Sequence, residues 1–371
     1  MISYYKISFI IICIIFTIYL QKKFLDDKKK NILKKGRKYL DYCLKGSIKK
    51  IFYFIKKEPK ISVIIPVYNC QKTIKYSLMS IQNQLLLDYE IILINDFSKD
   101  NSKKIIESIQ KKENRIIIIN NNRNMGTLYS RNIGVLASRG KYIFPLDNDD
   151  ILFNPKLFGL LYKEGKNNNY DIIGFKTIYG LNYLCSVDNM FNEPFIENKA
   201  DKIVVQPKLK FLSIKNNDCH IWGKLIKTEI YKNAINSMGI KRYSVYLCFA
   251  EDDVMVFMIF SSSKVYKYLP IYGLFHLNSN NTASFTLSKN HKLFSKIYYL
   301  DILFQFTDNN FKEKRYVSNF AIILSKMFNF RTTMNTRSYL KQVINKLLNC
   351  NFIEKKQKNE IKNSFKKYII I

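Results

Sequence analysis

The chain has 371 residues, and its 61 Lys or Arg against 29 Asp or Glu give a formal net charge of +32 at pH 7. This charge is compatible with nucleic-acid binding. However, lysine, asparagine, isoleucine and tyrosine are frequent throughout, so we predict no specific nucleic-acid partner, while anionic membranes and substrates stay open. Seven scattered cysteines without a C-x-x-C pair, and only three histidines, argue against a zinc site or a disulfide framework.

The N-terminus carries an uncharged apolar run, ISFIIICIIFTIYL, at residues 7–20. Extended back to Ile2, it has about the length that spans a bilayer. No small-residue cleavage site follows, so we expect a transmembrane anchor over residues 1–20 rather than a signal peptide, with a buried core helix as the alternative. We therefore expect a single-pass membrane protein, of the ER or Golgi if the source is eukaryotic.

A lysine-rich segment over residues 21–59 follows and is typical of a basic juxtamembrane stem. The positive-inside rule places such a stem in the cytoplasm. Many single-anchor enzymes instead face the lumen, so the orientation stays open.

From Ile61 onward, short apolar strands alternate with amphipathic helices. We predict strands at 61–65, 90–95, 115–120 and 141–146, and helices at 73–84, 100–112 and 127–138. Pro66 is expected to end the first strand, Asp100 to cap the second helix and Gly140 to cap the end of the third. This alternation favours an α/β fold in which helices flank a mostly parallel sheet on both faces.

Beyond Pro155 the pattern is less regular. Strands are expected near 170–177 and 264–269, and a segment at 219–235 holds the only tryptophan. From residue 286 to 371 we predict a helical, basic C-terminal extension.

Polar residues follow each of the four predicted N-terminal strands. Ligands of open α/β sheets bind at the carboxyl ends of the strands, near a topological switch point. These polar stretches are PVYN (66–69), NDFSKDNS (95–102), NNNRNMGTLYSRNIG (120–134) and DNDD (147–150). The sequence therefore predicts a ligand site along this edge, which we call the rim.

The DNDD stretch places Asp147 and Asp149 on one side of an extended chain. Paired carboxylates suit Mg²⁺ or Mn²⁺ bound together with substrate phosphates. Asp150 is equally well explained as a helix cap. Because P-loop and G-x-G-x-x-G motifs are absent, a phosphate would need metal and basic side chains. Arg131 is one candidate, the alternative being a solvated helix residue.

A second acidic cluster, Glu251, Asp252 and Asp253, begins a predicted buried helix. Acidic residues are favoured there by the helix dipole alone. The functional alternative is that one of these carboxylates projects into the cleft as a general base.

Three stretches, ISVIIPVYNCQKTIKYSLMSIQNQ, YEIILINDFSKDNS and NRNMGTLYSRNIGVLASRGKYIFPLDNDD, together resemble the family 2-like glycosyltransferases of GT-A fold. The resemblance covers residues 60–150 and continues more loosely through IWGKLIKTEIY and EDD to about 285. It implies a Rossmann-like GT-A domain over 60–285, with a nucleotide-sugar half (60–150) and an acceptor half (151–285). It also implies a nucleotide-sugar donor, Mn²⁺ or Mg²⁺, and inversion at the anomeric carbon.

The resemblance also implies roles for individual residues. The first strand end would hold the nucleotide base, Asp96 the uracil or ribose, and the next loop and helix would lie beside the donor. Asn95 replaces the usual first Asp of the D-D-x-S turn. The donor-binding residues so implied are Pro66, Val67, Tyr68, Asn69, Asp96, Asn124, Gly126, Arg131 and Asp147.

For the metal, the D-x-D resemblance implies Asp147 and Asp149, with Asp149 as the direct ligand. Asp252 matches the catalytic base of the family's E-D motif. Because Asp253 is also acidic, the motif could be aligned one residue later. His276 would lie near the diphosphate, with a packed histidine as the alternative.

These observations predict a membrane-anchored glycosyltransferase. It would move a sugar, from a UDP-sugar by the resemblance, to a hydroxyl of a glycan, protein or lipid acceptor. The alternatives are a catalytically silent binding or scaffold protein and, less favoured, a basic nucleic-acid-binding protein. The sequence leaves the sugar, the acceptor and the linkage open.

Overall fold

The computed structural model describes residues 58–180, 202–205, 220–247, 250–277, 289–306, 334–349 and 355–364. The chain divides into two units, residues 1–58 and 59–371, and the fold below belongs to the second. The predicted anchor and nearly all of the stem lie outside the described residues. Among the helices that are described, none is long and apolar enough to cross a membrane.

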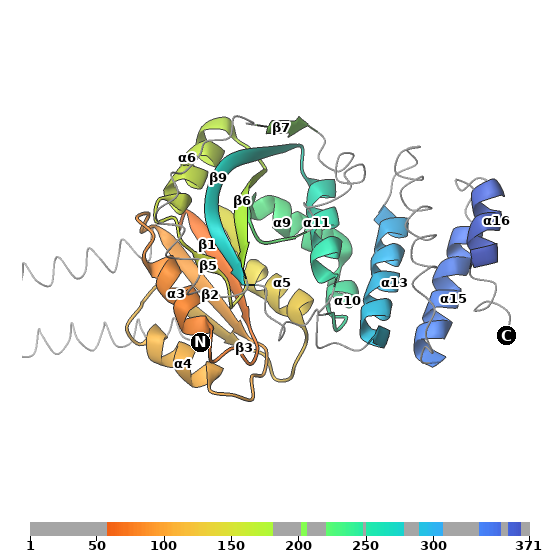
Figure 1. The fold of residues 1–371 in the computed structure, drawn as a ribbon, viewed down its shortest axis with the longest axis horizontal. Coiled ribbons are helices and arrows are strands. Elements are labelled where there is room, and N and C mark those ends of the chain that lie inside the picture. The colour runs from red at the N-terminus through yellow and green to blue at the C-terminus, as the bar shows by residue number, and fades with distance from the viewer. Residues whose placement is uncertain are drawn as a thin grey trace, which may run out of the picture. The chain divides into compact units, whose positions relative to one another are not determined.

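Strands and helices alternate through the first half as the sequence predicts (Figure 1). The strands are β1 (Ile61–Val67), β2 (Tyr89–Asn95), β3 (Ile116–Asn120), β4 (Tyr142–Pro145), β5 (Ile151–Leu152), β6 (Ile172–Gly180), β7 (Lys202–Val205), β8 (Lys224–Lys227) and β9 (Val265–Leu277). The helices are α3 (Ile74–Gln82), α4 (Ser102–Gln110), α5 (Thr127–Ala137), α6 (Leu157–Asn168), α9 (Thr228–Met238), α10 (Ile240–Tyr243), α11 (Glu251–Ser262), α13 (Lys289–Phe306), α15 (Met334–Leu348) and α16 (Lys355–Ser364).

The strands form one sheet in the order β3-β2-β1-β4-β8-β6-β9-β5, and β7 pairs with β9. Strands β1 to β4 are parallel, as predicted. The prediction of a mostly parallel sheet is wrong for the second half, where β8 runs antiparallel to both β4 and β6, and β9 runs antiparallel to β5 and β7. Only β6 and β9 are parallel there. The described sheet is therefore mixed, because the helical connections after β5 and β8 bring the next strand back in the opposite direction.

The strand order reverses at β1, which has β2 on one side and β4 on the other. Such a reversal is the switch point where α/β sheets bind ligands. The PVYN stretch lies at the end of β1 and the DNDD stretch follows β4. Because β1 and β4 are neighbours in the sheet, the topology brings both stretches to one place on the rim.

Pro66 does not end the first strand, because β1 continues to Val67. The ladder between β1 and β4 stops at the pair Ile64–Pro145, so the missing N–H of Pro66 breaks no bond to β4. The Pro66 carbonyl accepts a hydrogen bond of 3.0 Å from Asn148 Nδ2 instead.

Helices cover both faces of the sheet (Figure 1). Successive side chains of a strand point to opposite faces, so Ile64 joins the core cluster beneath α5, α9 and α11, while Val63 and Ile65 join the cluster beneath α3, α4 and α6. The inward residues predicted for α3 are all fully buried: Ile74, Leu78 and Ile81. Those predicted for α4 are Ile106, which is fully buried, and Ile105 and Ile109, which are partly buried.

Three predicted helix ends are corrected. Helix α4 begins at Ser102, one residue later than predicted, although Asp100 Oδ1 still accepts from Ser102 N at 2.9 Å. Helix α5 ends before Ser138, and Gly140 is required by close packing, since a Cβ there would lie 2.5 Å from Ser62 Oγ. Asp150 caps no helix, because α6 begins only at Leu157.

The described part of the C-terminal extension is helical, as predicted. Buried residues of α13 share the core cluster of α11, and Tyr298 Oη donates to the Arg242 carbonyl at 2.7 Å.

Candidate active site

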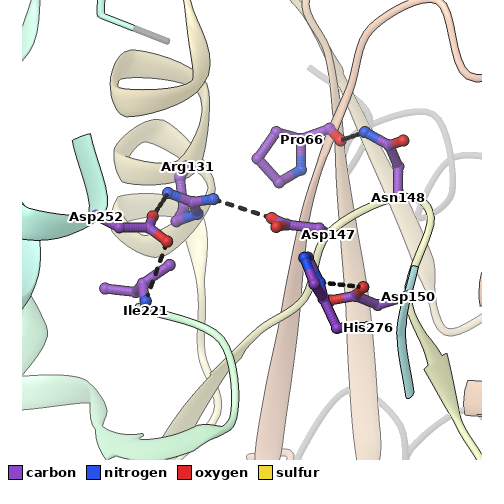
Figure 2. A network of polar contacts seen from close by, with 8 residues as sticks. All are labelled: Pro66, Arg131, Asp147, Asn148, Asp150, Ile221, Asp252 and His276. Carbon is purple, nitrogen blue, oxygen red and sulfur yellow. Dashed lines mark hydrogen bonds and ion pairs between the residues drawn. The ribbon is translucent and has the colours of Figure 1, made fainter. Parts of the chain in front are cut away.

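Arg131 on α5 is 1% exposed and joins two carboxylates from distant parts of the chain (Figure 2). Its Nη2 lies 3.0 Å from Asp147 Oδ1 and its Nη1 lies 2.9 Å from Asp252 Oδ1. Burial alone would lower the pKa of Arg131, but the two carboxylates outweigh it and raise this pKa, so the guanidinium stays charged. The alternative of a solvated helix residue is wrong, and direct contact with a donor stays a prediction.

Asp252 lies in the first turn of α11. Its Oδ2 accepts from the backbone N–H of Ile221 at 3.2 Å, so each carboxylate oxygen has one donor (Figure 2). Burial raises the pKa of Asp252, and Arg131 counteracts this. The residue before the helix, Ala250, has a left-handed backbone with φ 56°, an uncommon conformation for a non-glycine residue that is typical of functional sites.

The two other acids of this cluster differ from Asp252. Burial and the neighbouring Asp252 raise the pKa of Glu251 to about 8, so Glu251 is mostly a neutral acid at pH 7. Asp253 acts on Lys296 of α13, where it opposes the effect of burial on the lysine pKa. The structure therefore brings Asp252 to Arg131, whereas the charge of Asp253 acts on a lysine of α13.

Asp147, Asp150 and His276 form a cluster in which one ligand atom of each lies within 4.8 Å of the others. Asp150 is fully buried, and its Oδ1 lies 2.8 Å from His276 Nδ1 (Figure 2). Burial raises the pKa of Asp150 to about 7. Burial lowers the pKa of His276, but the bond to Asp150 and the charges of Asp150, Asp147 and Asp149 together outweigh this, and the pKa rises to about 9.

This cluster fits a divalent metal ion. Asp150 Oδ2 is buried and has no hydrogen-bond partner among the described residues, which leaves a carboxylate oxygen available to a cation. The His276 imidazolium would lose a proton to bind a metal ion, and two carboxylates with a neutral imidazole suit Mn²⁺, whereas Mg²⁺ favours oxygen ligands. Asp147 belongs to this cluster together with Asp150, which like Asp147 lies between β4 and β5, and His276 of β9, and its role as a metal ligand stays a prediction.

Asp149, the predicted direct metal ligand, lies outside this three-residue cluster. Burial, together with the charge of Asp147, raises the pKa of Asp149 to about 6. Its role as a ligand stays a prediction, and Asp150 becomes a second candidate within the same stretch.

Asp96 is buried at the end of β2 and holds the loop that follows β3. Its Oδ1 accepts from Met125 N at 2.8 Å and from Asn121 Nδ2 at 2.7 Å, and its Oδ2 accepts from Gly126 N at 2.9 Å. Asn124 Oδ1 also accepts from Gly126 N, at 3.1 Å. Asp96 therefore shapes the predicted donor loop, and its contact with a uracil or ribose stays a prediction.

Asn95, which replaces the usual first Asp of the turn, is fitted to its place by neutral amide bonds. Its Nδ2 donates to Asn120 Oδ1 at 2.9 Å, and its Oδ1 accepts from Ser98 N at 3.1 Å. An Asp at this position has no N–H to donate and would lose the bond to Asn120. The presence of Asn at position 95 is therefore explained by Asn120 on the neighbouring strand.

The ends of β1 and β2 are cross-linked by short polar contacts. Asn69 N donates to Ser98 Oγ at 3.3 Å, and Lys99 N donates to Asn69 Oδ1 at 2.8 Å. Asn69 and Phe97 both have left-handed backbones. Tyr68 is 45% exposed and Phe97 40%, so two aromatic rings are accessible on the rim.

Sequence reasoning assigned no role to the segment before β8. His220 and Trp222 stack with ring centroids 4.4 Å apart, and Trp222 and His276 stack at 4.6 Å. Ile221, between the first two, donates to Asp252. Two features of the sequence could have pointed to this segment: it holds the single tryptophan, and IWGKLIKTEIY loosely resembles the family.

Comparison with known proteins shows which proteins this chain resembles. Residues 62–206 match the family described as Glycosyl transferase family 2. The uncharacterized glycosyltransferase EpsJ of Bacillus subtilis (strain 168) is 32% identical over 47% of this chain and 50% of its own length. A GalNAc(5)-diNAcBac-PP-undecaprenol beta-1,3-glucosyltransferase of Campylobacter jejuni is 31% identical over 42% of this chain and 48% of its own length.

The fold is similar to that of S. aureus TarS 1-349 in its crystal structure with UDP-GlcNAc, with a TM-score of 0.58 at 14% identity, covering 84% of this chain and 90% of that one. Residues 62–206 therefore match the family 2 glycosyltransferases, and the fold is similar to that of TarS, so the resemblance to family 2-like glycosyltransferases is confirmed over this part of the chain. The chain spans about half the length of these two curated relatives.

Proposed function

We propose that this protein transfers a sugar from a nucleotide-sugar donor, a UDP-sugar, to an acceptor hydroxyl with inversion. The observation that carries the proposal is the Arg131 bridge, which holds Asp252 and Asp147 on one guanidinium. A base and a donor-side carboxylate are thereby fixed relative to each other, as an in-line displacement requires. The solved structures of TarS with UDP and UDP-GlcNAc support the choice of donor.

Asp252 is the general base in this proposal. Its side chain is 19% exposed, so an acceptor hydroxyl can reach it, and the bonds from Arg131 and Ile221 fix its orientation. It would remove the hydroxyl proton as the oxygen attacks the anomeric carbon, a contribution of about 10²–10⁴-fold in rate. Glu251, mostly protonated beside it, adds little negative charge that would repel the donor.

Asp147, Asp150 and His276 would hold a divalent metal, with Mn²⁺ preferred for the imidazole ligand. When bound, such an ion offsets the charge that develops on the leaving diphosphate. The role of this chain is to gather three ligands, two from the connection between β4 and β5 and one from β9. Asp149 completes the predicted D-x-D motif beside them.

The acceptor is proposed to be a hydroxyl of a glycan, protein or lipid, at a membrane surface reached through the predicted N-terminal anchor. The relative from Campylobacter jejuni, named for a polyprenyl-diphosphate-linked glycan, supports an acceptor of the lipid-linked class.

The test is a donor screen. The full chain in detergent is incubated with Mn²⁺ and a panel of nucleotide sugars, and the release of nucleoside diphosphate is measured. We expect release from one UDP-sugar that chelator abolishes and Mn²⁺ restores. Metal-dependent donor binding without release or transfer would instead favour a silent binding protein, and absence of binding to every donor would contradict both.

A further inference from the structure

Trp222 stacks on two histidine rings that lie on different elements of the fold. Its indole is nearly parallel to the imidazole of His220, at an interplanar angle of 12°, and to that of His276, at 16°. The centroid distances of 4.4 and 4.6 Å are within the range of stacked aromatic rings. One side chain thus contacts the segment before β8 and a residue of β9 at once.

The backbone around Trp222 is fixed on both sides. On one side, Lys224 Nζ donates to the His220 carbonyl at 2.6 Å, and Ile221 N donates to Asp252 at 3.2 Å. On the other, Phe175 N donates to the carbonyl of Gly223, whose backbone is left-handed at φ 69°. The indole is therefore held by a backbone segment that also orients the proposed base.

On its other face, the indole contacts His276. This histidine belongs with Asp147 and Asp150 to the group of possible metal ligands, which we call the metal-side cluster. The bond from Asp150 to Nδ1 fixes one edge of the His276 ring, and it leaves the plane of that ring unspecified. Stacking on Trp222 specifies that plane. Groups that orient a metal-binding histidine in this way usually change affinity or activity about 10–100-fold when removed.

We propose that Trp222 is a positioning residue for sugar transfer, which sets the ring plane of His276 at the metal-side cluster and the Ile221 amide at Asp252. This inference rests on the proposed function and adds to it that one side chain aligns the metal side and the base side of the site. Stacking on both His220 and His276 distinguishes Trp222 from Phe175 and Phe144 of the same core cluster.

Simple core packing is the alternative, because Trp222 is only 6% exposed and belongs to the core cluster that contains Phe175. Trp222→Leu removes the flat ring, Trp222→Phe keeps one, and Phe175→Leu is the matched control. Phe175 is 4% exposed in that cluster and stacks on Phe144, so its replacement costs packing without removing a ring that stacks on a histidine.

The first measurement is Mn²⁺ affinity of the full chain, followed by the signal of free Mn²⁺ at a temperature where every variant is folded. We expect Trp222→Leu to weaken binding at least about tenfold, and Trp222→Phe to stay within about threefold of wild type. Phe175→Leu should lower the melting temperature while leaving Mn²⁺ affinity unchanged. Equal Mn²⁺ affinity in Trp222→Leu and Phe175→Leu would overturn the inference.

The second measurement needs neither metal nor donor. The chain has three histidines, so their ring signals in a long-range ¹H–¹⁵N spectrum can be assigned with His291→Gln and His220→Gln. We expect the His276 ring protons to lose the ring-current shift of the indole in Trp222→Leu and to keep a smaller one in Trp222→Phe. Unchanged His276 signals in Trp222→Leu would overturn this inference alone, whereas a wild type that binds neither Mn²⁺ nor donor would overturn the proposed function.

Discussion

Arg131 and Asp252 are 121 residues apart in the sequence and form an ion pair of 2.9 Å at the centre of the site. The same guanidinium reaches Asp147 with its other terminal nitrogen. A planar fork can bond two carboxylates at once in a fixed geometry, which a lysine ammonium cannot reproduce. The relative position of the base and the donor-side acid therefore depends on this one side chain.

Replacing Arg131 by Lys should lower kcat by roughly 10²-fold, because one ammonium cannot hold both carboxylates in place and small displacements of a catalytic group are costly. Steady-state kinetics with the donor found in the screen measures this loss. Arg115→Lys is the control, since Arg115 makes a comparable two-bond pair with Glu113 away from the site. Wild-type kcat in folded Arg131→Lys would refute the bridging role.

Glu251 predicts a pH dependence of stability. Burial, followed by the charge of Asp252, raises its pKa from 4.5 to about 8, so between these values the folded state binds more protons than the unfolded state. Its contribution to stability is therefore complete below about pH 4.5 and is lost as pH rises through about 8. The free energy of unfolding of wild type should fall over this range more steeply than that of Glu251→Gln.

Urea unfolding at pH 5, 6, 7 and 8 measures both slopes, whose difference should approach but not exceed about 1.4 kcal/mol per pH unit. Glu229→Gln is the control, because Glu229 is an exposed acid in the first turn of α9. Parallel curves for wild type and Glu251→Gln would show that Glu251 is ionised in the folded protein at neutral pH.

Gly126 should not tolerate a side chain. Its φ of 87° and ψ of 164° lie in a region that only glycine adopts readily, and a Cβ there would be 3.0 Å from the Leu247 backbone. Gly126→Ala should cost about 1–3 kcal/mol of unfolding free energy and weaken UDP binding, because the loop held by Asp96 must shift. Denaturant titration measures the change in unfolding free energy, and calorimetry measures the change in UDP affinity.

Gly159→Ala is the opposite case within the same fold. Gly159 lies inside α6, and a Cβ there meets nothing within 4 Å. Alanine should stabilise the protein by about 0.5–1 kcal/mol and leave UDP affinity unchanged. If the two alanine variants had the same effect on UDP binding, the loop of Gly126 would have no part in the donor site.

The metal-side cluster predicts that Asp150→Asn lowers Mn²⁺ affinity. Loss of one charged ligand from three should weaken binding by at least about tenfold, whereas Asp100→Asn, at the same rim but outside the cluster, should not. Asp149→Ala is expected to leave the protein folded and abolish metal-dependent transfer. Full Mn²⁺ affinity in Asp150→Asn, together with its loss in Asp149→Ala, would restore Asp149 as the direct ligand.

The first half of the fold could be predicted because its signals are local. The continuous apolar run of β1, which is buried throughout, and the helical spacing of α3 follow from neighbouring residues alone, and residues 61–145 were assigned with small errors at element ends. The second half could not, since β9 pairs with three other strands, β5, β6 and β7, from distant parts of the chain. No short-range pattern encodes such pairing.

The site was predictable in its acids and not in their partners. Asp147 and Asp252 are recognisable from motifs, whereas the bond between Asp150 and His276 spans 126 residues. Asp150 resembled a helix cap because turn acids and helix caps share a sequence signature. The stacking role of Trp222 depends on β9 lying beside the segment before β8, which only the tertiary structure supplies.

In the proposed mechanism Asp252 transfers the proton and takes no part in binding the donor. The variant Asp252→Asn tests this separation of roles most directly. The amide keeps the shape of the carboxylate and cannot accept the hydroxyl proton. Paired measurements of UDP affinity with Mn²⁺ and of transfer rate should show wild-type affinity with turnover lower by about 10²–10⁴-fold. Turnover at the wild-type rate in Asp252→Asn would contradict the assignment of this residue as the base.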